Sequence, residues 1–264
     1  MLIFVANQSD YAILKNGLSV PQTGTLFNIK RNLLMNAIFT KDFFTHMYRR
    51  KNFVPRLLLV LFAVILMGFC LSWLVLCDMG TDPCTMMNLA ISNKLGMAIG
   101  NWQALLNIVL LVFVIIFGGR NLGFGTLANM FLVGYSLQFF SWLWGIVLPA
   151  GIVIDGVFTS MAMRIGVLIP ALICFIFAAA LYMDVDLGTA PYDAMPYIAW
   201  NALKKKFPSL QFRFVRIGYD ILVVIIALLF GGKLGIVTAL MAFVLGPVID
   251  FVGKQLQKVI EIDE

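Results

Sequence analysis

Residues 78–87 read DMGTDPCTMM, residues 184–195 read DVDLGTAPYDAM, and each stretch follows a long apolar run. Both contain the pattern Asp-x-Gly-Thr-x-Pro, and Gly80 aligns with Gly188 at an offset of 188 − 80 = 108 residues. The same offset aligns further pairs: Arg56 with Arg164, Phe69 with Phe177, Asp78 with Asp186 and Met87 with Met195. A match of this extent indicates an internal repeat.

A second pair of stretches extends the repeat. FGGRNLGFGT at 117–126 matches FGGKLGIVT at 230–238, with an offset of 113 that becomes 112. Small differences in loop length explain the changed offset. We therefore predict a first repeat at residues 53–149 and a second at 150–254, preceded by an N-terminal segment, 1–52, and followed by a tail, 255–264.

The composition is that of a membrane protein. Of the 264 residues, 61% are hydrophobic and 12% are charged, whereas soluble domains average about 45–50% apolar and 25% charged residues. The formal net charge of +6 is first read as a topology signal. We expect the lipid bilayer as the partner and no binding of nucleic acid.

Six apolar runs are long enough for helices that cross a hydrocarbon core of about 30 Å. They lie at 54–77, 102–117, 124–148, 163–184, 214–230 and 234–253. The runs do not alternate polar and apolar residues as the strands of a membrane barrel do. The sequence predicts an all-α membrane protein with six transmembrane helices.

The basic residues orient these helices. With the N-terminus in the cytoplasm, only Lys94, Arg164 and Lys233 of the 19 lysines and arginines fall on the outer side. Cytoplasmic loops carry an excess of such residues. We expect a bacterial cell-membrane protein with both termini in the cytoplasm.

Each repeat holds three of the predicted spans, and the odd number makes the second copy enter the membrane from the opposite side. Inverted three-helix repeats are typical of secondary transporters, which bind substrates where the repeats meet. The alternative is a duplication that serves packing alone.

Each Gly-Thr-x-Pro motif starts a short helix. Asp82 is a natural N-cap before Pro83 and Gly96 a natural end, while Thr189 or Ala190 precedes Pro191. A helix over residues 83–95 is about 20 Å long, too short to cross the bilayer. It is either re-entrant, with its N-terminus toward the interior, or interfacial. From these motifs, the candidate substrate- or ion-binding residues are Thr81, Asp82, Thr189 and Asp193.

The predicted fifth span contains Arg216 and Asp220, four residues apart on one helix face. The offset of 113 maps these residues to Gln103 and Asn107. Charged residues in a membrane cost about 2.5–3.5 kcal/mol each on insertion scales and usually face protein or water. We predict that all four line a cavity, with Asp220 as a candidate proton or cation coupler. The alternative is that Arg216 reaches the headgroups or that the pair only joins helices.

The second half resembles the YczE/YitT-type group of small bacterial integral membrane proteins. The resemblance is carried by Asp-Leu-Gly-x-x-Pro-x-Asp at 186–193, by GGxLGxxT at 231–238, and by the Arg216–Asp220 pair. In the first half, Thr85 replaces the second acidic residue of the phrase. The resemblance covers about residues 52–254 and implies a bacterial multi-pass membrane protein, without implying a substrate.

Other classes of function find little support. The four cysteines form no CxxC pair, and His46 is the single histidine, so we expect no metal and no cofactor. Enzyme motifs such as H-E-x-x-H and G-x-S-x-G are absent, and we expect no enzyme.

Residues 1–52 mix basic and apolar residues, as an amphipathic cytoplasmic segment does. Small residues on the spans leave a homodimer open.

Two functions follow from these observations. The first is a secondary transporter or exporter of a small molecule, with alternating access at the interface between the repeats. The alternative is a non-transporting membrane protein with a regulatory or assembly role.

Overall fold

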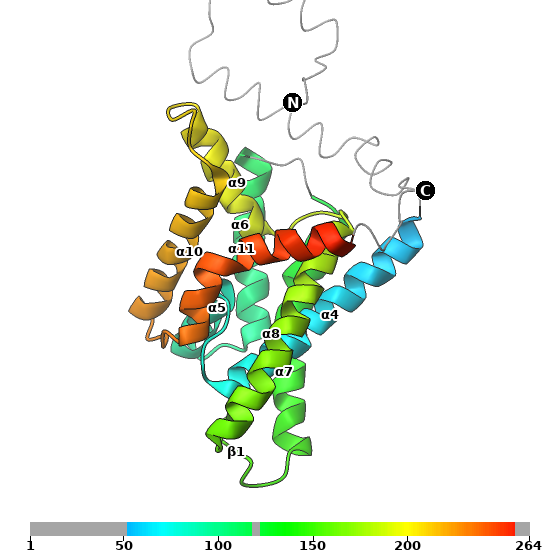
Figure 1. Ribbon diagram of the computed structural model, residues 1–264, viewed down its shortest axis with the longest axis vertical. Helices are drawn as coiled ribbons and strands as arrows, with labels where there is room; N and C mark the ends of the chain where they lie inside the picture. The colour runs from blue at the N-terminus through cyan, green and yellow to red at the C-terminus, as the bar shows by residue number, and fades with distance from the viewer. Residues whose placement is uncertain (1–51, 118–121, 257–264) are drawn as a thin grey trace, which may run out of the picture.

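The computed structural model describes residues 52–117 and 122–256 (Figure 1). Apart from Asn52, the predicted amphipathic segment 1–52 lies outside the described residues, as does most of the predicted tail 255–264.

The described chain is almost entirely helical. Its long helices are α4 (Phe53–Cys77), α6 (Ile99–Phe117), α7 (Phe124–Val147), α8 (Met161–Asp184), α10 (Phe212–Leu229) and α11 (Ile236–Leu256). Two short helices, α5 (Pro83–Leu95) and α9 (Pro191–Lys204), follow the two Gly-Thr-x-Pro motifs. The six predicted apolar segments are therefore confirmed as helices, with ends shifted by up to three residues.

A small β-hairpin was not predicted. Strand β1 (Val153–Ile154) pairs antiparallel with β2 (Val157–Phe158) in the connection between α7 and α8. Its two-residue turn consists of Asp155 and Gly156, which both have positive φ angles, of 51° and 76°. Asp-Gly is a preferred sequence for such a turn.

Five helices of the described residues are long and apolar enough to cross a membrane: α4, α6, α7, α8 and α11. Helix α10 differs, because its 18 residues include three charged ones, Arg213, Arg216 and Asp220. Large apolar side chains point outward from the bundle; Ile173 is 63% exposed and Leu229 is 79% exposed. Such a surface suits lipid rather than water, and the chain is a helical membrane protein.

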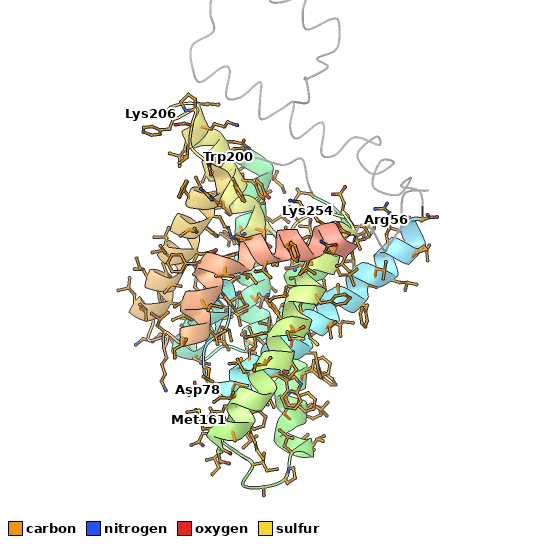
Figure 2. All side chains as sticks on the ribbon, viewed as in Figure 1. Arg56, Asp78, Met161, Trp200, Lys206 and Lys254 are labelled. Carbon is orange, nitrogen blue, oxygen red and sulfur yellow. The ribbon has the colours of Figure 1, made fainter. Side chains whose placement is uncertain are left out.

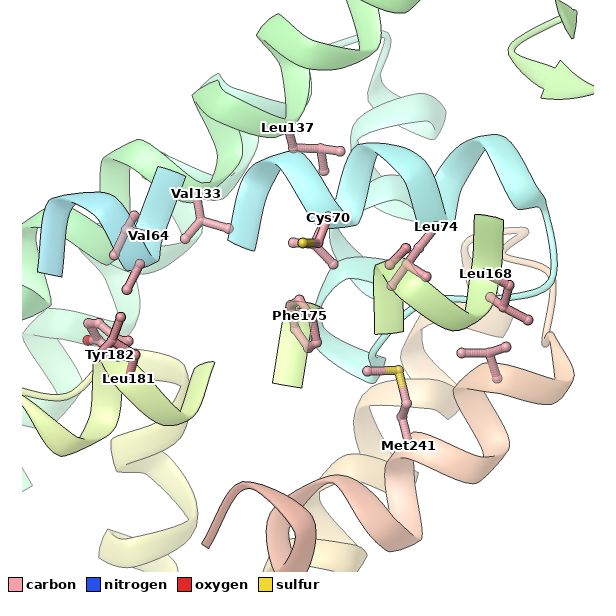
Figure 3. Close-up of a cluster of buried hydrophobic side chains, with 14 of the residues drawn as sticks. Val64, Cys70, Leu74, Val133, Leu137, Leu168, Phe175, Leu181, Tyr182 and Met241 are labelled. Atoms are coloured by element: carbon pink, nitrogen blue, oxygen red, sulfur yellow. The ribbon is translucent and has the colours of Figure 1, made fainter. Parts of the chain in front are cut away.

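The main core lies where α4 packs against α7 and α8, with α11 joining from the side of α8 (Figure 3). Leu74 of α4, Leu137 of α7 and Phe175 of α8 are buried there. Helices α4 and α7 approach closely at Gly68, where a β-carbon would collide with Ser136. Small residues at such crossings are characteristic of helix contacts in membranes.

The two motif turns have the same backbone conformation. Asp78 and Asp186 have φ angles of 50° and 52°, and Gly80 and Gly188 have φ angles of 108° and 109°. Only glycine adopts the latter region without strain. The sequence repeat therefore corresponds to a matched local structure.

Each motif turn lies against the start of a distant helix. The carbonyl of Met79 accepts a hydrogen bond of 3.0 Å from the Val237 amide of α11, and that of Leu187 accepts one of 2.8 Å from the Gly125 amide of α7. Threonine hydroxyls add a second contact at both places: Thr238 accepts from the Thr81 amide, and Thr126 donates to the Thr189 carbonyl.

The short helices pack against elements remote in sequence. Helix α5, which follows α4, packs mainly against α10 and also contacts α6, and α9, which follows α8, packs against both α6 and α10 (Figure 1). Helices α5, α6, α9 and α10 thus form a second packing unit beside the main core. Its apolar centre includes Met86, Met87, Tyr192 and Val223.

Several basic side chains lie toward one end of the molecule. Figure 2 shows Arg56, Trp200, Lys206 and Lys254 toward one end, and Asp78 with Met161 toward the other. At the latter end, Arg164 lies 3.9 Å from Asp78.

Candidate functional site

The first component of the site is the start of α5. Asp82 is its N-cap, as predicted, and the Oδ2 atom accepts a hydrogen bond of 3.0 Å from the Thr85 amide. Pro83 occupies the first turn, and Gly96 ends the helix in the left-handed region, again as predicted. Asp82 is 8% exposed, and the Oδ1 atom is buried without a hydrogen-bond partner among the described residues.

The second component is a charge network between α9 and α10. The predicted pair forms: Arg216 Nε donates to Asp220 Oδ2 at 3.0 Å. The same guanidinium also donates from Nη1 to Asp193 Oδ1 at 2.8 Å. Arg216 therefore links two carboxylates on two helices, and the planar shape of its side chain permits both bonds at once.

Tyr192 closes this network. Its hydroxyl donates to Asp220 Oδ1 at 2.9 Å, so that both carboxylate oxygens of Asp220 are bonded. The Tyr192 ring also lies 5.6 Å from the Arg216 guanidinium carbon and 5.0 Å from the Tyr219 ring. Asp220 itself is 5% exposed.

Cys84, in the first turn of α5, connects the two components. Its thiol lies within electrostatic range of Asp82, Asp193, Arg216 and Asp220. Asp82 in turn lies within range of Asp193 and Asp220. The cluster brings three carboxyl groups and one guanidinium together, so acidic groups are in excess.

The surroundings of the cluster are apolar. Cys84 and Tyr219 pack against the buried group that contains Met86, Met87 and Val223. Electrostatic interactions are strong in such surroundings, and an unpaired charge is costly. Two more polar atoms of this unit are buried without hydrogen-bond partners in the described part of the chain: Asn88 Oδ1 of α5 and Trp102 Nε1 of α6.

The other predicted site residues lie elsewhere. Gln103 and Asn107 are buried on α6 and contact α7: Gln103 packs on Gly134, and Asn107 Nδ2 lies 3.4 Å from the Met130 carbonyl. Thr81 and Thr189 take part through their backbone atoms in the crossings described above. The structure thus joins Asp82, Asp193, Arg216 and Asp220, while their grouping with Gln103 and Asn107 in one cavity stays a prediction.

Three residues in or beside the cluster were not predicted as site residues: Tyr192, Cys84 and Tyr219. Tyr192 lies between Pro191 and Asp193, inside the repeated motif, and that position was a usable signal. Cys84 holds the equivalent position after Pro83 in the first motif.

The chemistry of the cluster is that of carboxylic acids and a guanidinium. Among the described residues, no three His, Cys, Asp or Glu side chains are arranged to hold a metal ion. Carboxyl groups in apolar surroundings can bind a proton or a cation, and Arg216 can bind an anionic group when it leaves one of its two partners.

Comparisons with known proteins agree with these membrane features. A model of the family described as "Family of unknown function (DUF6198)" matches residues 54–254. The chain is 22% identical over 178 residues to the uncharacterized membrane protein YczE of Bacillus subtilis (strain 168), covering 66% of this chain and 73% of YczE. It is also 22% identical over 178 residues to the uncharacterized protein YyaS of the same organism, covering 67% of this chain and 82% of YyaS. No solved structure matches the chain.

Proposed function

The chain belongs to the DUF6198 family, and we propose that it is a secondary transporter or exporter of a small molecule in the bacterial cell membrane. Membership agrees with the resemblance to the YczE-type group. The proposal itself rests on the arrangement of the site.

We propose that the chain forms two inverted repeats of three spans each, with α10 as the sixth span. The matched φ angles at Gly80 and Gly188 support this arrangement, as do the matched crossings at Met79 and Leu187. The exchange of short helices, α5 against α10 and α9 against α6, is what a pseudo-twofold relation would produce. The burial of Thr85, Met87 and Asn88 favours a re-entrant α5 over an interfacial one.

One observation carries the proposal: the charge cluster joins helices of both proposed repeats. Asp82 stands on α5 of the first repeat, and Arg216 and Asp220 stand on α10 of the second. Charged groups in a membrane protein usually mark an ion or substrate pathway. Secondary transporters place such groups at the repeat interface, beside the N-termini of broken or short helices.

The mechanism follows from the bonds that tie α9 to α10. While Arg216 holds both Asp193 and Asp220, the network is closed. A substrate or ion that replaces one of these bonds loosens α9 from α10, and the repeats can then rock about the motif crossings. Alternating access requires this coupling between site occupancy and conformation.

For the orientation, we propose that both termini face the cytoplasm. Arg56, Lys206 and Lys254 gather toward one end of the molecule (Figure 2). This end would face the cytoplasm by the positive-inside rule.

The test is a ligand screen followed by transport. Purified protein is screened by thermal shift against choline, tetramethylammonium, glutamate, phosphate and sodium. Compounds that stabilise it are then offered to proteoliposomes with an imposed proton or sodium gradient. We expect gradient-driven uptake of at least one of them, and its loss in Arg216→Gln. If all five fail to stabilise the protein and none is taken up, the proposal is wrong for these substrate classes.

A non-transporting regulatory or assembly role is the second candidate. The observation that favours it is the closed network, in which Arg216, Asp193, Asp220 and Tyr192 satisfy one another. Such a network can simply join helices. In that case Asp220→Asn lowers thermal stability, while transport and its pH dependence, if measurable, stay unchanged.

A further inference from the structure

We propose that Asp82 is the proton-binding residue of this protein, and that its proton controls the contact between α5 and the Arg216 network. The inference deepens the proposed transport function, because it names the proton as the coupling ion. It rests on Asp82 differing from the two other carboxyl groups of the cluster.

The difference lies in the partners. Asp193 and Asp220 both accept hydrogen bonds from Arg216, and Asp220 accepts a second from Tyr192. Asp82 is bonded through Oδ2 to a backbone amide alone, and Oδ1 is buried without a partner in the described part of the chain. Asp193 and Asp220 thus each have a cationic hydrogen-bond partner, whereas Asp82 has none among the described residues.

The cost of an unpaired charge then decides the state of Asp82. Asp82 is 8% exposed, and an isolated carboxylate in such a place is strongly disfavoured unless it is neutralised. The negative charges of Asp193 and Asp220 add to this cost. A proton bound to Oδ1 neutralises Asp82 and so removes this cost, and it needs no oxygen ligand beyond that atom.

Metal cations fit the position less well. A hard cation takes about six oxygen ligands, whereas the unpartnered oxygens on α5 are Asp82 Oδ1 and Asn88 Oδ1. The groups that face the cluster from the neighbouring elements are Cys84 on α5, Tyr192 and Asp193 on α9, and Arg216, Tyr219 and Asp220 on α10. Arg216 is the one cationic group among them, and it already binds two carboxylates.

Loss of the proton has a mechanical consequence. An ionised Asp82 interacts unfavourably with Asp220 and Asp193, and the like charges repel across the contact of α5 with α10. Deprotonation therefore pushes α5 away from α10, and protonation allows it to return. Asp82 sits at the N-terminus of α5, so the change acts directly on the short helix of the first repeat.

The Asp82→Asn variant separates the two roles of Asp82, which are binding a proton and capping α5. Asparagine is as good an N-cap as aspartate, and its amide oxygen can still accept from Thr85. The variant therefore keeps α5 while removing the titrating group; Asp82→Ser gives a second capping variant without a carboxyl. The matched control is Asp78→Asn, because Asp78 is a half-exposed carboxyl outside the cluster and asparagine tolerates its left-handed backbone.

Infrared spectra of the full-length protein in lipid bilayers at neutral pH provide the readout. A protonated carboxyl group gives a C=O stretching band apart from the amide bands. We expect this band in the wild type and in Asp78→Asn, and its loss in both Asp82 variants. Absence of the band in the wild type, its persistence in Asp82→Asn, or its loss in Asp220→Asn alone would each overturn the proposal.

The infrared result stands apart from transport. For any compound that is taken up in the transport assay, Asp82→Asn should abolish uptake driven by a proton gradient while retaining exchange of labelled for unlabelled compound. Sodium-driven uptake that survives in Asp82→Asn would contradict the proton as coupling ion. If the band is lost as expected but no compound is transported, Asp82 remains a proton site and the transporter proposal fails alone.

Discussion

The Tyr192 hydroxyl donates a hydrogen bond of 2.9 Å to Asp220 Oδ1, and both groups are buried. The bond joins the first turn of α9 to the middle of α10, so it ties together two helices that a loop separates in the chain. Both carboxylate oxygens of Asp220 are bonded only while Tyr192 is in place.

Replacing Tyr192 by phenylalanine should therefore destabilise the protein. We expect a loss of about 1–3 kcal/mol, the usual effect of leaving a buried charged acceptor with one bond fewer. Unfolding of purified protein in detergent measures it. Tyr219→Phe is the control, because Tyr219 packs beside Tyr192 and no described bond to Asp220 is lost; an equal effect of both variants would assign the loss to ring packing.

Arg216→Lys should be far from conservative. The guanidinium bonds Asp220 through Nε and Asp193 through Nη1, whereas an ammonium is a point charge that cannot hold both carboxylates in this geometry. We expect a lower unfolding temperature than for Arg213→Lys, in which the residue is exposed on the same helix. Matching unfolding temperatures would mean that the bridge contributes nothing to stability.

Gly188→Ala tests the motif crossing. A β-carbon at Gly188 would lie 2.5 Å from the Gly123 amide nitrogen, and the φ of 109° is unfavourable for alanine. We expect a loss of at least about 1–3 kcal/mol. Gly166→Ala should be neutral or mildly stabilising, because nothing lies within 4 Å of that position and alanine favours helices. Thermal unfolding of the two variants in parallel measures the difference. Equal unfolding temperatures would contradict a close crossing at Gly188.

Labelling with a membrane-impermeant maleimide tests the inverted topology. Lys94 and Lys205 are both exposed, and the proposed topology places Lys94 outside and Lys205 in the cytoplasm. In a background with the exposed Cys174 replaced by alanine, Lys94→Cys should label in intact cells and Lys205→Cys only after lysis. Labelling of both from the same side would rule out inverted repeats.

Much of the fold could be predicted from the sequence because its signals are local. Apolar runs mark the long helices, and Asp82, Pro83 and Gly96 mark both ends of α5 through capping chemistry that acts within a few residues. The Arg216–Asp220 pair was likewise predictable, since four residues on a helix bring two side chains to the same face.

The composition of the site was less predictable because it depends on packing between distant segments. No local signal places α5 against α10, and so the nearness of Asp82 to Asp220 could not be derived from spacing. The repeat offset aligns Asn107 with Asp220 in sequence, but an alignment does not say which neighbour a side chain meets, and Asn107 contacts α7. The role of Tyr192 depends on the same packing, because its hydroxyl meets Asp220 only where α9 lies against α10.

The three charged residues of α10 also bear on how the protein is made. A charged residue costs about 2.5–3.5 kcal/mol at the centre of an isolated inserting helix, and Arg216 and Asp220 have further partners on α9, earlier in the chain. Tyr192 and Asp193 are therefore synthesised before α10. We therefore expect the proposed sixth span, α10, to leave the insertion machinery together with a segment that has already been synthesised, rather than as an independent unit.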